Sequence, residues 1–79
     1  MNRMPEYEFR VLCADGKASC TYVKSLMKDF KNIADADMRK PYDHTGVIEA
    51  KNSNAALQKE KELKKIAGNA IRNIEIALL

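Results

Sequence analysis

Residues 6–17, Glu-Tyr-Glu-Phe-Arg-Val-Leu-Cys-Ala-Asp-Gly-Lys, carry the strongest structural signal in this chain. Their first half alternates apolar and charged residues, and this period of two predicts a half-buried β-strand. The apolar members are Tyr7, Phe9 and Val11. The strand runs into Asp15-Gly16, a dipeptide that favours a type I′ hairpin turn because both residues tolerate positive φ. The stretch therefore predicts an N-terminal β-hairpin over residues 6–23.

The second strand of this hairpin has a competing interpretation over residues 18–23. With Asp15 and Gly16 in the turn, Cys20 faces Val11 across the hairpin, which is a consistent strand register. The same Cys20 also starts a helically spaced apolar series with Val23, and a helix could then begin near Ser19. We adopt the strand because turn and alternation agree, and the helix stays open as the alternative.

The rest of the chain predicts two amphipathic helices joined by a loop. Apolar residues recur at intervals of three and four over residues 24–39, which predicts a helix that Pro41 follows. Residues 40–53 are rich in turn-forming types and predict a loop, with a possible short third strand at 47–50. Residues 54–78 predict the longest helix.

These elements predict one α+β domain over residues 1–79, an N-terminal β-hairpin followed by two amphipathic helices packed on one face of the hairpin. Asn52, Ser53 and Asn54 are candidate N-caps for the last helix. Gly68, in its interior, is expected to allow close packing against another element. The predicted core consists of Tyr7, Phe9, Val11, Tyr22, Leu26, Met27, Phe30, Ile33, Leu63, Ile66, Ala70, Ile71 and Ile74.

Length and composition exclude several classes of protein. A chain of 79 residues is too short for two independent cores. No apolar run approaches the roughly 18 residues of a membrane span, and the N-terminus lacks the apolar stretch of a signal peptide. We therefore expect a cytoplasmic, intracellular protein with no membrane contact, in which Cys13 and Cys20 are thiols.

The sequence does not contain a recognisable spacing for a metal site or a catalytic site. Two cysteines and the one histidine, His44, match no class of zinc ligand pairs, so we expect no metal and no cofactor. Cys13 and Cys20 are interpreted as small buried hydrophobes. Cys13 or Cys20, together with His44 and Asp43, supplies the residue types of a thiol nucleophile with its base and an orienting carboxylate. A histidine in a polar loop, however, is more often a turn residue. We expect a protein that is not an enzyme.

Surplus apolar side chains at the C-terminus favour a protein-binding function. Ile76 and Leu79 fall off the apolar stripe of the predicted last helix and suggest a second contact. Tyr42, in the loop, is a second candidate anchor for a protein partner. The leading hypothesis is a non-enzymatic protein-binding module, a small inhibitor or adaptor of the type that phages and mobile elements encode, which occludes a partner surface. Homodimerisation through the last helix is the simplest way to bury the surplus.

The alternative hypothesis is a regulator that binds nucleic acid. The formal net charge is +3, and the lysine-rich segments supply candidate phosphate contacts. These candidates are Lys28, Lys61, Lys65 and Arg72. Glu60 and Glu62 interrupt the cluster, and mixed charge of this kind is typical of a solvated helix face.

Overall fold

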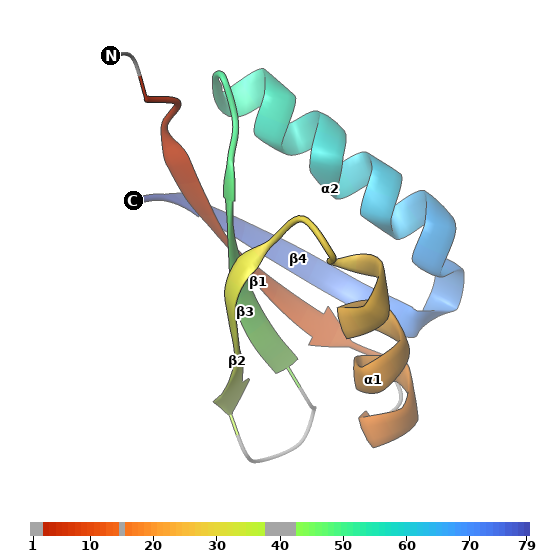
Figure 1. Ribbon diagram of the computed structural model, residues 1–79. Coiled ribbons are helices and arrows are strands. Elements are labelled where there is room, and N and C mark those ends of the chain that lie inside the picture. The colour runs from red at the N-terminus through yellow and green to blue at the C-terminus, as the bar shows by residue number, and fades with distance from the viewer. Residues whose placement is uncertain (1–2, 15, 38–42) are drawn as a thin grey trace.

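The computed structural model describes residues 3–14, 16–37 and 43–79, which form a four-stranded sheet and two α-helices (Figure 1). The elements in chain order are β1 (Glu6–Cys13), α1 (Gly16–Leu26), β2 (Lys31–Asp37), β3 (Asp43–Glu49), α2 (Ser53–Ala67), the 3₁₀-helix η1 (Gly68–Ala70) and β4 (Ile71–Leu78). This βαββαβ order is the split β-α-β, or ferredoxin-like, arrangement.

The sheet is antiparallel throughout, with strand order β2-β3-β1-β4. β1 lies inside the sheet, and both of its neighbours come from distant parts of the chain. Because successive side chains alternate between faces, Phe9 and Val11 lie on the same face as their cross-strand partners on β3, Gly46 and His44. Arg10 and its partner Thr45 lie on the opposite face.

Both helices cover the face of the sheet to which Phe9 and Val11 point. Cys20 and Val23 of α1 and Leu63 of α2 belong to one buried cluster with the alternate residues of β1. Phe9 is fully buried, and its ring makes an edge-to-face contact with the Phe30 ring at a centroid distance of 5.1 Å. The protein therefore has two layers, with one face of the sheet uncovered by helices (Figure 1).

The predicted hairpin is wrong beyond its first strand. β1 ends at Cys13, and residues 18–23 belong to α1, so the helical alternative describes this segment. The physical reason is burial: Cys20, Val23 and Met27 all lie in the core, and only helical spacing brings them to one face. The strands that pair with β1 are β3 and β4, and these long-range pairs replace the local register that an Asp-Gly turn favours.

The predicted helix over residues 24–39 is also wrong. α1 ends at Leu26, and two short turns follow, in which Met27 N–H donates to Lys24 O and Phe30 N–H donates to Met27 O. The strand β2 then occupies residues 31–37, and Asn32 has a φ of +55° at a break in its register with β3. Because β2 is an irregular edge strand, its apolar and polar residues do not alternate regularly, and the sequence pattern does not indicate a strand there. Residues 38–42 lie outside the described part of the chain.

The predicted loop and last helix need two further corrections. The loop predicted over 40–53 contains β3, so the possible third strand is present, and it begins at Asp43 and has seven residues rather than the short span at 47–50. The helix predicted over 54–78 ends at Ala67, and the remaining residues form η1 and β4. Gly68 ends the helix with a φ of +58°, and its N–H donates to Lys64 O. No heavy atom lies within 4 Å of a Cβ built there, so Gly68 is needed for the turn and not for close packing.

Three members of the predicted core lie at the surface: Tyr22, Ile33 and Ile66 are 47%, 37% and 61% exposed. Tyr22 belongs to the core in the strand register of the predicted hairpin, which α1 replaces. Ile33 and Ile66 belong to it on helical stripes, which the observed elements interrupt or rotate. Among the candidate caps, Asn52 is the N-cap of α2, and its Oδ1 accepts from Ala55 N–H at 2.9 Å. This bond satisfies one of the N–H groups that the first turn leaves unpaired.

Candidate functional site

The most unusual group in the interior is a cluster of Cys13, Cys20 and His44, all of them buried. They come from three elements: Cys13 ends β1, Cys20 lies in the middle of α1, and His44 lies near the start of β3. Their two sulfur atoms and one ring nitrogen all lie within 4.8 Å of one another. The fold therefore brings together every cysteine of the chain and its one histidine.

The register of the sheet explains this meeting. His44 lies opposite Val11, and Cys13 is two residues further along the same face of β1. α1 lies above this end of β1 and directs Cys20 toward the sheet. The Cys20 Sγ is 3.4 Å from His44 Nδ1, and the Cys13 Sγ is 3.8 Å from the same nitrogen. Nδ1 is therefore the point on which both thiols converge.

The other ring nitrogen of His44 has a different neighbour. His44 Nε2 lies 3.1 Å from the Sδ of Met27, a fully buried residue that follows α1. A thioether sulfur accepts a hydrogen bond and has no proton to donate. This neighbour favours the tautomer with the proton on Nε2, which leaves the lone pair of Nδ1 directed at the two thiols.

The surroundings of Cys13 favour a neutral thiol. Burial raises the pKa of Cys13 from 9.0 to about 12, and the neighbouring Cys20 and Asp43 add to the rise. Lys24 acts in the opposite direction. A thiol with so high a pKa is a poor nucleophile at neutral pH. Cys13 thus belongs to the Cys–His arrangement considered from the sequence, but its surroundings do not activate its thiol as a nucleophile.

Asp43, which the sequence offers as a partner for His44, faces the other side of the sheet. It lies opposite Leu12, and its Oδ2 accepts from Arg10 Nε at 3.0 Å. Asp43 is 3% exposed while Arg10 is half exposed, so the pair lies at the margin of the open face. The carboxylate therefore does not orient the His44 ring.

The second candidate site is the free edge of β4. β4 ends the sheet on one side, and its last residue, Leu78, and the following Leu79 are apolar and 66% and 63% exposed. Leu79 N–H donates to Glu6 O at 2.9 Å, which continues the pairing with β1 past the end of the strand. Of the residues expected at a protein interface, Ile76 is half-buried against the core, Leu79 is exposed, and Tyr42 lies outside the described residues.

The four residues expected to contact nucleic acid are all exposed, but they come from three separate parts of the fold. Lys28 follows α1, Lys61 and Lys65 lie on α2, and Arg72 lies on β4. Neighbouring α2 residues also form ion pairs: Lys59 Nζ bonds to Asp29 Oδ2 at 2.7 Å, and Lys64 Nζ lies 3.5 Å from Glu60 Oε2. The helix surface is a mixture of both charges.

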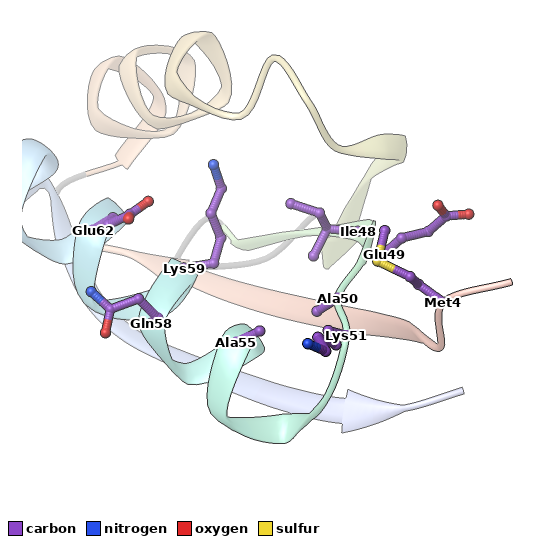
Figure 2. Close-up of a pocket in the computed structure, with 9 residues that line it drawn as sticks. All are labelled: Met4, Ile48, Glu49, Ala50, Lys51, Ala55, Gln58, Lys59 and Glu62. Atoms are coloured by element: carbon purple, nitrogen blue, oxygen red, sulfur yellow. The ribbon is translucent and has the colours of Figure 1, made fainter. Parts of the chain in front are cut away.

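A shallow depression of about 280 Å³ lies between the end of β3 and the first turns of α2 (Figure 2). Ile48, Ala50 and Ala55 supply apolar surface, and charged side chains of both signs surround it. The charged members are Glu49, Lys51, Lys59 and Glu62. The residues that line it include no histidine, cysteine, serine or threonine.

Comparison with family models, curated proteins and solved structures finds no match to this chain. In the part of the chain that the structure describes, neither helix has the length and apolar character needed to cross a membrane.

Proposed function

We propose that this protein is a protein-binding module that works by strand addition at the edge of β4, with a second copy of the chain as the occupant. The observation that carries the proposal is the contrast between the two edges of the sheet. β4 has eight residues, no proline and a single register shift with β1, near its start, whereas an edge strand that avoids pairing is usually short, charged or irregular. The proposal preserves the self-association expected from the sequence but moves it from a helix to a strand.

The opposite edge, β2, has the features of a protected edge. Its register with β3 shifts at two places, and Asn32 interrupts the strand with a positive φ. Its sequence, Lys-Asn-Ile-Ala-Asp-Ala-Asp, carries three charges in seven residues. β4 has only Arg72 and Glu75 as charged residues. Strand addition is therefore favoured at β4 and disfavoured at β2.

The hydrogen-bonding groups of β4 define how a second copy would pair. In an antiparallel strand, the N–H and C=O of one residue point to the same side, and the side alternates along the strand. Because Leu79 donates to β1, Ala77 and Glu75 share its direction, and the even-numbered residues point to the free edge. These are Ile74, Ile76 and Leu78.

One symmetric register suits these groups and the side chains together. Pairing centred on Ile76 places Leu78 beside Ile74 of the second copy, so that three apolar pairs form on the helix-covered face. The same register puts Glu75 opposite Ala77 of the second copy. A register centred on Glu75, in which the two strands slip by two residues, would set two like charges face to face, which is destabilising. Charge and apolar pairing therefore favour the same arrangement.

The nucleic-acid alternative has less support from the side chains of the described residues. Sheets that bind single-stranded nucleic acid present aromatic rings on the open face for base stacking. Here Tyr7, Phe9 and Phe30 belong to the buried core. A basic surface on α2 is interrupted by acidic residues, as the sequence indicated. Binding of nucleic acid stays a prediction, and steep loss of binding between about 50 and 200 mM salt is its test.

Sedimentation equilibrium over a range of protein concentrations tests the proposed dimer. We expect a monomer–dimer equilibrium in the wild type and a shift toward monomer in Leu78→Lys, because a lysine there replaces an apolar pair. Tyr22→Lys is the matched control: it also replaces an exposed apolar residue, but on α1, and it should leave the equilibrium unchanged. A wild type that stays monomeric at its highest soluble concentration would overturn the proposal. A dimer equally weakened by both substitutions would do the same.

The inhibitor or adaptor role expected from the sequence belongs to the same proposal. A dimer joined through β4 leaves both helix surfaces available to a further protein, and Tyr22 and Leu57 supply apolar anchors there at 47% and 46% exposure. Capture of a host protein by the wild type and its loss in Tyr22→Lys would support this role. No difference between the two would count against it.

A further inference from the structure

We infer that Cys13, Cys20 and His44 form a binding site for one Zn²⁺ ion per chain, with both thiolates and His44 Nδ1 as ligands. The inference concerns the interior of the fold and does not depend on the pairing of β4. It starts from the observation that a soft ligand set from three separate elements is gathered in the core. Thiolate and imidazole are the ligands that Zn²⁺ takes most often in proteins.

The spacing of the three donor atoms fits a tetrahedral zinc ion. Zn–S bonds of about 2.3 Å and Zn–N bonds of about 2.0–2.1 Å separate the sulfur and nitrogen ligands by about 3.5–3.6 Å at the tetrahedral angle. The two Sγ–Nδ1 distances are 3.4 Å for Cys20 and 3.8 Å for Cys13. These distances bracket the sulfur–nitrogen value for a tetrahedral site, so each of these two spacings needs a shift of only a few tenths of an ångström, and the two sulfur atoms lie within 4.8 Å of each other. An ion between the three atoms would be reached by all of them.

The residue behind His44 supports the same assignment. A histidine that binds a metal through one nitrogen keeps its proton on the other, and a hydrogen-bond acceptor there holds the ring in place. The Sδ of Met27, 3.1 Å from Nε2, supplies a weak acceptor in that position. The ring is also fully buried between β3 and α1, which restricts its rotation. Nδ1 is thereby presented toward the two sulfur atoms.

Charge balance selects a divalent cation. Two thiolates and a neutral imidazole carry a charge of −2, and Zn²⁺ brings the buried group to zero. A monovalent ion such as Cu⁺ would leave one negative charge in the core, where an unbalanced charge is costly. On binding, each thiol loses its proton to solvent and forms one S–Zn bond, so two protons leave for each ion bound. Three protein ligands leave one tetrahedral position for water or another small ligand.

The test uses the full chain, reduced and freed of metal. The protein is mixed with excess Zn²⁺, passed through a desalting column and assayed for bound metal. We expect one zinc per chain in the wild type and a loss of at least ten-fold in affinity in Cys20→Ala. Val23→Ala is the matched control: it removes buried atoms from the same helix but no ligand, and it should retain one zinc.

A second measurement needs no variant and keeps the inference testable if Cys20→Ala fails to fold. Co²⁺ replaces Zn²⁺ and reports its ligands by absorption, so the wild type should show intense tetrahedral bands and thiolate-to-metal charge transfer. Absence of the charge-transfer bands would overturn the inference. Retention of no metal, retention of one ion per two chains, or equal retention by Cys20→Ala and Val23→Ala would also overturn it. Because the dimer is measured separately, failure of either proposal leaves the other unaffected.

Discussion

The Sγ of Cys20 lies 3.4 Å from Nδ1 of His44, although 24 residues of chain separate the two. The contact joins α1 to β3 through the core. It depends on the antiparallel pairing of β1 with β3, which sets His44 opposite Val11 and close to Cys13. The register of one strand pair thus decides whether these side chains form a site or remain three unrelated residues.

The buried thiol of Cys13 predicts how stability falls at high pH. Its pKa is about 12 in the folded protein and 9.0 in an ordinary environment, so the folded state holds the proton more tightly. This contribution is complete below about pH 9 and is lost as pH rises through 12, by at most about 1.4 kcal/mol per pH unit. Cys20 and Asp43 raise this pKa and Lys24 lowers it.

Chemical denaturation of the metal-free protein at several pH values measures this loss. Cys13→Ala is the comparison, because it removes the titrating group while the other ionisable residues remain. The free energy of unfolding should fall less steeply above pH 9 in Cys13→Ala than in the wild type. Parallel curves for the two proteins would contradict the prediction.

Gly46→Ala should destabilise the protein through steric conflict in the core. A Cβ at this position would lie 2.9 Å from Met27 Cε and 3.2 Å from Phe30 Cδ2. Overpacking of this kind costs about 1–3 kcal/mol. Urea denaturation measures the loss, and shortening the obstructing side chain by Met27→Val should recover part of it. No loss in Gly46→Ala would show that β3 and the segment after α1 are less closely packed than the structure indicates.

Gly68→Ala should also destabilise the protein, but for a conformational reason. The φ of +58° is unfavourable for any residue with a Cβ, and such strain costs about 1–3 kcal/mol. There is open space around the position, so packing does not contribute. The control is Asn69→Ala, an exposed neighbour with negative φ, which should change the free energy of unfolding by less than about 0.5 kcal/mol. Equal effects at both positions would contradict this explanation.

The proposed register of the dimer predicts opposite effects of two charges at Ala77. This residue would lie opposite Glu75 of the second copy, and the pair would occur twice in a symmetric dimer. Ala77→Lys should tighten the dimer and Ala77→Glu should weaken it, each by about 0.2–1 kcal/mol per pair. Because Ala77 also lies opposite Glu8 in its own chain, the measured quantity is the dissociation constant of the dimer and not stability. A dissociation constant that is the same in both variants would rule out this register.

The sequence predicted those features that depend on neighbouring residues. The alternation in residues 6–12 predicts β1, and the structure has that strand with Tyr7, Phe9 and Val11 buried. Asn52 was among the candidate caps because a short polar side chain can accept from the first turn of a helix. The last predicted helix is correct over most of its first half, where strong helix formers such as Leu, Lys and Glu predominate.

Only the tertiary structure decided the partners of β1 and the end of each helix. Apolar spacing over residues 24–39 and 68–78 is compatible with a helix, but pairing in the sheet buries Ile71 and Ile74 as strand residues. Such pairs join segments more than 30 residues apart, and a local pattern carries no information about them. The same holds for Cys13, Cys20 and His44: the chain supplies the ligand types, and the register of β1 with β3 and the position of α1 bring them within reach of one ion.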